Sequence, residues 1–97
     1  PAGRLIVDEG ARRALGNPDG ASLLPIGIVE VEGEFHAGDV VEVLGPDRKA
    51  IGRGIVNYSA SEIRRIKRLH SREVPRILGR QGSEEVIHRD NMVVTGE

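Results

Sequence analysis

Residues 22–44 have the sequence SLLPIGIVEVEGEFHAGDVVEVL, which carries the plainest strand signals in the chain. Apolar residues run almost continuously from 23 to 31, and apolar and acidic residues alternate toward the end of that run. A turn rich in small and polar residues at 36–39 precedes a second β-branched run at 40–44. Alternation with a period of two, bounded by turn residues, is typical of strands with one face in water. We therefore expect strands at 23–31 and 40–44.

Further strands are expected on both sides of this stretch. The segment 50–58 returns after a turn at 45–48 and contains Gly52 and Gly54. Glycine inside a strand usually marks a bulge or a close approach by another backbone, which suits a tightly curled sheet. The remaining strands are expected at 5–7, 84–87 and 92–95. The chain is thus predicted to be mainly β with short helices, an α+β fold in which about six mostly antiparallel strands form a mixed pseudo-barrel.

A first short helix is expected directly after the strand at 5–7. Apolar residues recur there at helical spacing, in Ala11, Ala14 and Leu15. Asp8 is the expected N-cap, because its carboxylate can accept an orphan backbone N–H and interacts favourably with the helix dipole. Gly16 is well placed to end the helix.

A second and a third helix are expected between residues 59 and 79. Ser59 and Glu62 have the spacing of a capping box, in which each side chain accepts a backbone N–H of the other residue. The buried face of this helix is expected to carry Ile63, Ile66 and Leu69. Ser71 is the expected cap of the next helix, and Gly79 its C-terminal stop.

Length and composition predict one small domain over residues 1–97, with a thin aliphatic core. The net charge is −1, so bulk charge gives no reason to expect non-specific binding to nucleic acid. There is no cysteine and no apolar run of about 20 residues, which favours a cytoplasmic location and no membrane partner. Because the chain opens on Pro1 and lacks an initiating methionine, we expect it to be a processed product or a fragment, with a larger native context.

No catalytic or metal-binding constellation is recognisable in the sequence. His36, His70 and His88 are far apart, have no metal-ligand spacing and have no cysteine beside them. Asp8 and Glu9 are poor partners as acid and base, because adjacent side chains at a helix entrance usually point apart. Capping explains Asp8 and the serines, and no Gly-x-Ser-x-Gly elbow presents a serine as a nucleophile. We therefore predict no catalytic residue, no metal site and no cofactor in this chain.

Positive charge is concentrated between residues 62 and 80, where there are seven basic residues and only two acidic ones. Such a run is more often a solvated helix face, or one that docks on an acidic neighbouring domain, than a nucleic-acid site. Only Phe35 and Tyr58 could serve as stacking platforms for RNA bases. The candidate face for phosphate or partner contacts consists of Arg64, Arg65, Lys67, Arg68 and Arg72.

Several segments together are similar to one family. They are VDEGA at 7–11, SLLPIGI at 22–28, GEF at 33–35, GDVV at 38–41 and VIHRDN at 86–91. The chain resembles the PUA domain at the carboxyl end of many bacterial glutamate 5-kinases, and the similarity spans nearly its whole length. Two places depart from the pattern: Pro75, and the pair Lys67 and Arg68, where a glycine is common.

The resemblance implies a longer parent enzyme. That enzyme would transfer the γ-phosphoryl group of ATP to the side-chain carboxylate of L-glutamate, in the first step of proline biosynthesis, with Mg²⁺. The reaction would belong to a separate amino-acid kinase domain, which residues 1–97 do not contain. This domain would be non-catalytic.

The resemblance also implies where RNA would bind, since PUA domains that bind RNA use the first helix, the strand after it and the final strand. The residues implied are Arg12, Arg13, Leu24, Pro25 and Gly27. Their alternative reading is structural, with Leu24 and Pro25 packing and Gly27 forming a bulge. Two functions therefore stay open. One is an RNA-binding module; the other is a regulatory or architectural appendage that packs on the kinase domain or a neighbouring subunit of a homo-oligomer, affecting assembly or feedback by proline.

Overall fold

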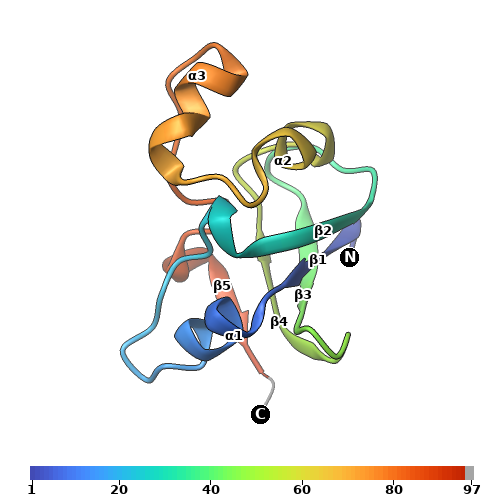
Figure 1. The fold of residues 1–97 in the computed structure, drawn as a ribbon. Coiled ribbons are helices and arrows are strands. Elements are labelled where there is room, and N and C mark those ends of the chain that lie inside the picture. Colours follow the sequence, from blue (N-terminus) through green and yellow to red (C-terminus); the bar gives the residue numbers. More distant parts are fainter. Residues whose placement is uncertain (96–97) are drawn as a thin grey trace.

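The computed structural model of the chain describes residues 1–95. Short helices and short strands follow one another along this part of the chain (Figure 1). In chain order, with η marking a 3-10 helix, the elements are β1 (Gly3–Val7), α1 (Glu9–Leu15), η1 (Pro25–Gly27), β2 (Ile28–Gly33), β3 (Val40–Leu44), β4 (Ala50–Ile55), α2 (Ala60–Ile66), η2 (Ser71–Glu73), α3 (Val74–Leu78), η3 (Arg89–Asn91) and β5 (Met92–Val94).

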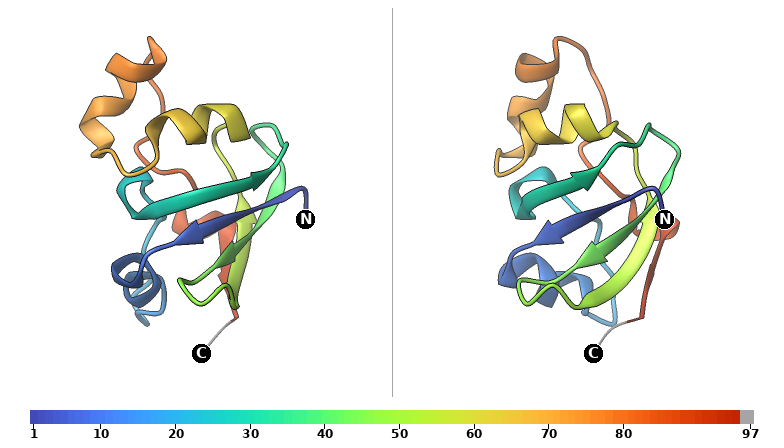
Figure 2. Two further views of the ribbon diagram at one scale, coloured as in Figure 1. Left: turned by 45° about the vertical axis from the view of Figure 1, so that its right-hand side comes forward. Right: turned by 90° about the vertical axis from the view of Figure 1, so that its right-hand side faces the viewer.

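The strands form one mixed sheet in the order β2-β1-β3-β4-β5. Only β1 and β3 run parallel, and the other three pairs are antiparallel. A single bridge between Leu23 and Ile87 joins the segments that lead into the two edge strands, which closes the curled sheet on that side. Figure 2 shows the sheet curling between α2, which lies beside β2, and α1, which follows the end of β1. The predicted fold class, a mixed and mostly antiparallel α+β fold, is confirmed.

Several strand boundaries differ from those expected. The run predicted as a strand at 23–31 becomes one only at Ile28, because Pro25 begins a 3-10 helix, where its fixed φ and missing N–H are easily accommodated. The strand expected at 50–58 ends at Ile55. The run at 84–87 contributes only the bridge at Ile87, so the sheet has five strands rather than about six.

The helix caps follow the sequence closely, with one exception. Asp8 caps α1, Ser59 and Glu62 form the capping box of α2, and Gly79 ends α3 with φ 74° in the left-handed region. Ser71, however, is not a cap. It begins η2, a 3-10 turn absent from the sequence reading, and the side chain of His70 accepts the N–H of Arg72 instead.

Helix α2 is also shorter than expected. It ends at Ile66, and Lys67 leaves the helix in an extended conformation with ψ 143°. Ile63 and Ile66 are buried as predicted, whereas Leu69 lies beyond the helix and is half-buried. Lys67 and Arg68 are therefore on a connection and Arg72 is in η2, so the predicted basic residues do not share one continuous helical face.

The two strand glycines allow the close approach that the sequence predicts. A Cβ on Gly52 would lie 2.5 Å from the carbonyl oxygen of Val93, and one on Gly54 would lie 2.7 Å from Ile87 Cγ2. Any side chain there would push β5 and its leading segment away from β4. The core inside this curl is aliphatic apart from Phe35, 3% exposed, and Tyr58, 1% exposed.

Candidate nucleic-acid interface

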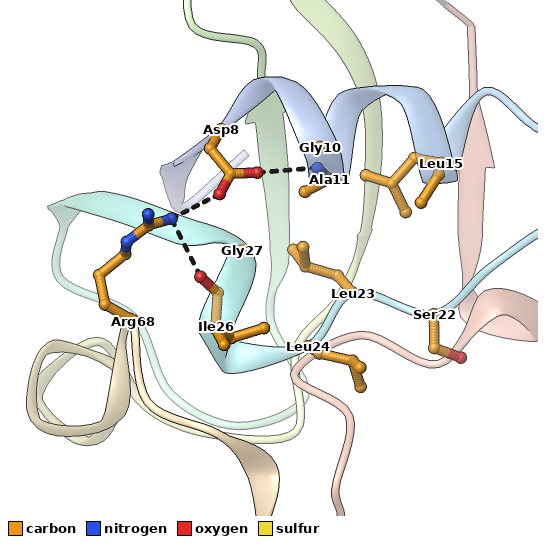
Figure 3. Close-up of a pocket in the computed structure, with 11 residues that line it drawn as sticks. Asp8, Gly10, Ala11, Leu15, Ser22, Leu23, Leu24, Ile26, Gly27 and Arg68 are labelled. Carbon is orange, nitrogen blue, oxygen red and sulfur yellow. Dashed lines mark hydrogen bonds and ion pairs between the residues drawn. The ribbon is translucent and has the colours of Figure 1, made fainter.

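A cavity of about 480 Å³ lies between α1 and the segment 22–27 (Figure 3). Its wall is mostly aliphatic, and the side chain of Arg68 stands at one side. A concave apolar surface with few polar groups is the usual form of a binding site. The aliphatic wall consists of Ala11, Ala14, Leu15, Leu23, Leu24 and Ile26.

Asp8 connects the start of α1 to the rim of this cavity. Its Oδ1 accepts the backbone N–H of Ala11 at 2.8 Å, and its Oδ2 accepts from Arg68 Nη1 at 2.6 Å. The hydrogen bond from Ala11 and then that from Arg68 hold the pKa of Asp8 below its ordinary value. The carboxylate therefore stays ionised at neutral pH and acts as cap and ion-pair partner together.

Gly27 sets the distance between α1 and η1, which lie on either side of the cavity. A Cβ at this position would lie 2.7 Å from the Cβ of Ala11, so a larger residue would push α1 away from η1. The carbonyl of Gly27 accepts the N–H of Asp8 at 3.0 Å. The structure thus places Gly27 in a helix-to-turn contact, not in the bulge considered from the sequence.

Arg68 reaches the same place from the far end of α2. Its backbone N–H donates to the carbonyl of Pro25 at 2.8 Å, and its Nη1 donates to the carbonyl of Ile26 at 3.0 Å. Its φ is 68°, in the left-handed region that non-glycine residues rarely adopt. Three hydrogen bonds, one of them to Asp8, therefore hold this residue against η1 and α1.

The five residues that the family resemblance implies divide into two groups. Leu24 and Gly27 line the cavity, with Pro25 buried between them in η1. Arg12 and Arg13 are not among the lining residues and instead share the carboxylate of Glu9. The hydrogen bond from Arg12, and a further one from Arg13, lower the pKa of Glu9 to about 2.

The basic residues of 62–80 are mostly engaged within the molecule. Five of the arginines donate side-chain hydrogen bonds to carboxylates or backbone carbonyls of the same chain. The pairs are Arg64 with Glu34 and Gly33, Arg65 with Ile77, Arg68 with Asp8, Arg76 with Glu73, and Arg80 with Glu62. Within residues 1–95, Lys67 and Arg72 form no ion pair. Arg68 is the member of this set that lines the cavity.

Apart from Leu24, the residues of the aliphatic wall were not identified from the sequence as part of a site. Ala11, Ala14 and Leu15 were recognisable only as one apolar face of a short helix. Leu23 and Ile26 lay in a run interpreted as a strand. No local signal distinguishes an apolar face that lines a cavity from one that packs in a core.

The structure supplies no metal or membrane-spanning feature in the part of the chain that it describes. Across residues 1–95, no three His, Cys, Asp or Glu side chains are grouped closely enough to hold a metal ion. The helices in this range lack the length and apolar character that crossing a membrane requires.

The comparison with protein families decides the relationship. Residues 3–78 match the sequence pattern of the PUA domain. The chain belongs to the PUA domain family. This PUA domain is 49% identical over 94 residues to glutamate 5-kinase of Synechococcus sp. (strain JA-3-3Ab). It is 49% identical over 92 residues to glutamate 5-kinase of Bordetella petrii. These alignments cover 97% and 95% of the chain but only 25% and 24% of the two enzymes.

Solved structures agree with this PUA assignment. A PUA domain protein from Aeropyrum pernix, crystallised as a tartrate complex, is 30% identical with a TM-score of 0.63, and the match covers 91% of this chain and 43% of that one. A chain of the archaeal box H/ACA sRNP Nop10-Cbf5 complex matches with a TM-score of 0.58 at 18% identity, covering 92% of this chain and 26% of that one. The latter likeness concerns the fold alone.

Proposed function

We propose that this PUA domain is an RNA-binding module whose contact surface is the cavity between α1 and the segment 22–27. The observation that carries the proposal is that Leu24 and Gly27, implied by the family resemblance, line one cavity together with Arg68. An aliphatic wall with a cation at its rim can hold the apolar face of a nucleotide while a phosphate lies outside. The matching part of a box H/ACA sRNP chain shows that this fold occurs in a chain of a ribonucleoprotein, which is an analogy of fold alone.

The chemistry of the surface sets the kind of affinity to expect. Phe35 and Tyr58 are both buried, so neither can stack on a base. Arg12 and Arg13 share the charge of Glu9, which reduces their attraction for phosphate. Binding should therefore be modest and depend strongly on salt, because the cations supply much of it.

The test is a titration of the chain with a mixed pool of structured RNA at a low and a high salt concentration. Ile26→Glu places a negative charge in the wall of the cavity and should abolish binding. Val40→Glu is the matched control, because Val40 is similarly exposed but begins β3, at the opposite end of the parallel strands from α1. Binding that Ile26→Glu leaves unchanged would refute this location.

A double variant tests the two arginines separately. Arg12→Glu with Arg13→Glu would add repulsion around Glu9, and loss of binding would place the RNA across the exposed side of α1. Unchanged binding would remove Arg12 and Arg13 from the contact surface. It would leave the cavity and its rim as the site.

A second function is favoured by the length of the relatives. The chain corresponds to the C-terminal portion of glutamate 5-kinases and spans about a quarter of their length. We propose that it is a non-catalytic appendage of such an enzyme, which phosphorylates L-glutamate with ATP in proline biosynthesis. Mg²⁺ and ATP would be held by the kinase domain of that enzyme, where the phosphoryl transfer would take place.

A surface for that role is the outer side of β3, β4 and β5. Val40 and Ile55 are directly paired across β3 and β4, and both are 40% exposed. Val93 on β5 pairs with Arg53, two residues from Ile55, and is 61% exposed. These three exposed β-branched residues lie on one face of neighbouring strands, together with the charged pair Arg53 and Glu42, and a kinase domain or a neighbouring subunit could cover that mixed face.

Deletion in the full enzyme tests the second function. Kinase activity, inhibition by proline and oligomeric state are compared between the intact enzyme, a form lacking this domain, and a form with Val40→Asp and Ile55→Asp. A change in any of them for both altered forms would support the appendage. Unaltered behaviour in both would reject it.

A further inference from the structure

The guanidinium of Arg68 uses only part of its hydrogen-bonding capacity. A guanidinium has five N–H donors in a rigid plane. Nη1 donates to Asp8 Oδ2 at 2.6 Å and to the carbonyl of Ile26 at 3.0 Å. Within residues 1–95, Nε and Nη2 donate to no acceptor, and the side chain is 49% exposed. One edge of the plane is thus held, and the other is available.

Because Nη1 of Arg68 is hydrogen-bonded, the direction of Nε and Nη2 is fixed as well. Figure 3 shows Nη1 directed at Asp8 and Ile26, with the other two guanidinium nitrogens on the side away from both. The backbone N–H of Arg68 is bonded to Pro25, so the residue is attached at both its main chain and its side chain. Much of the side-chain freedom that a surface arginine must lose on binding a ligand is therefore already lost.

The backbone conformation shows that this placement has a cost. A residue with φ 68° is in the region where glycine is comfortable and other residues are strained. Strain of this kind persists where the surrounding structure holds it, and it concentrates at binding sites. Arg68 keeps a long charged side chain at a position that glycine would occupy more easily.

We propose that Nε and Nη2 of Arg68 bind one phosphate group of an RNA strand lying across the cavity. Two parallel N–H groups match two phosphate oxygens, which a lysine ammonium cannot reproduce. Asp8 and the Ile26 carbonyl are positioning groups that touch only the arginine. This inference rests on the proposed RNA-binding function, since one arginine beside a carboxylate attracts a lone phosphate only weakly.

Asp8 has a second effect on the same phosphate. Its carboxylate lies next to the guanidinium and repels an incoming anion. Asp8→Asn keeps an N-cap acceptor for α1 and removes this charge, because asparagine is as good an N-cap as aspartate. In Asp8→Asn the hydrogen bonds from Arg68 to Ile26 and Pro25 remain, so the loss of repulsion should outweigh the loss of one positioning contact. The proposal therefore predicts opposite effects on RNA binding from removing the two partners of one ion pair.

The experiment compares RNA affinity over a range of salt concentrations for four variants of the 97-residue chain. Arg68→Gly suits the left-handed backbone, so the variant should fold, which circular dichroism would verify. It should bind the same RNA pool about tenfold more weakly, and the slope of log K against log salt should fall by about 0.7–0.9, the values for one phosphate on a single strand and on a duplex. Arg68→Lys should keep the slope and still lose affinity, because the charge remains and the fork does not.

Two further variants complete the set. Asp8→Asn should bind RNA more tightly than the unaltered chain. Arg76→Ala is the matched control, because it removes another arginine paired with a carboxylate, Glu73, on a surface away from the cavity. It should change neither affinity nor slope by as much as Arg68→Gly.

The outcomes distinguish failure of the phosphate contact at Arg68 from failure of the proposed RNA-binding function. If the unaltered chain binds RNA and Arg68→Gly has the same affinity and slope, the phosphate contact is refuted and the RNA-binding function stands. Equal affinity for Arg68→Lys and the unaltered chain would refute the bidentate fork. If the unaltered chain does not bind at low salt, both the function and the contact are refuted.

Discussion

Replacing Asp8 by alanine should destabilise the fold by about 1.5 kcal/mol. Loss of the N-cap hydrogen bond to Ala11, 2.8 Å long, costs about 1 kcal/mol. Loss of the half-exposed ion pair with Arg68 adds about 0.2–1 kcal/mol. For a domain of this size, 1 kcal/mol corresponds to about 4–8 °C in Tm, so Asp8→Ala should melt about 6–12 °C lower.

Asp8→Asn separates the two contributions. Asparagine can accept the same N–H and retains the cap, while the charge that attracts Arg68 is lost. This variant should lose only about 0.5 kcal/mol. Urea unfolding at neutral pH, followed by circular dichroism, gives the free energy of unfolding for all three proteins.

The pH dependence of the difference in unfolding free energy between the unaltered chain and Asp8→Ala provides a further check. The pKa of Asp8 lies below its ordinary value of 3.8, chiefly through the hydrogen bond from Ala11 and then that from Arg68. A carboxyl group with a lower pKa in the folded state stabilises the fold above its unfolded pKa, and this stabilisation disappears as the pH falls through the folded pKa. The difference between the unaltered chain and Asp8→Ala should therefore be full at neutral pH and narrow below pH 3.8.

Either of two results would refute this reasoning. Equal losses for Asp8→Ala and Asp8→Asn would mean that the cap contributes nothing and the charge everything. A difference between the unaltered chain and Asp8→Ala that widens on acidification would mean that the pKa of Asp8 is raised by folding. Both results can be read from the same unfolding curves.

Three further substitutions test the fold by the same measurement. Ser59→Ala removes half of the capping box and should cost about 1 kcal/mol, whereas Ser61→Ala, exposed in the same turn, should cost less; equal costs would contradict the cap. Ile63→Ala should cost about 2–5 kcal/mol because the side chain is fully buried, and a loss below 1 kcal/mol would mean that the core closes over the gap. Gly52→Ala should cost about 1–3 kcal/mol, since its Cβ would lie 2.5 Å from the carbonyl oxygen of Val93; unchanged stability would show that β5 yields freely.

Local features of the fold could be predicted from the sequence because they depend on residues a few positions apart. The capping box of α2 joins Ser59 and Glu62, three residues from each other. Strand β3 was predicted with its observed bounds, since alternation and flanking glycines are local signals. The failures occurred where two local tendencies compete. Pro25 turned part of an apolar run into a 3-10 helix, and η2 displaced the cap expected at Ser71.

The candidate site was predictable only in part. Leu24, Pro25 and Gly27 were reached through the family resemblance, and the structure places two of them in the cavity wall. Arg12 and Arg13 were implied in the same way, yet Glu9 at helical spacing pairs with both. That pairing is visible in the sequence as an i, i+3 and i, i+4 arrangement, and it would have lowered the expectation of free charge there.

What the sequence by itself determined is the family, the mixed β-rich class and the positions of most strands and caps, because these arise from short-range patterns and hydrogen bonds. Only the tertiary structure decided that Arg68 reaches Asp8, 60 residues away, and that the two meet beside an aliphatic cavity. The physical reason is that packing of α1 against η1, at the distance that Gly27 allows, brings these distant groups together. Arg68, which the sequence presents only as one of a run of basic residues, thereby lies at the rim of the cavity.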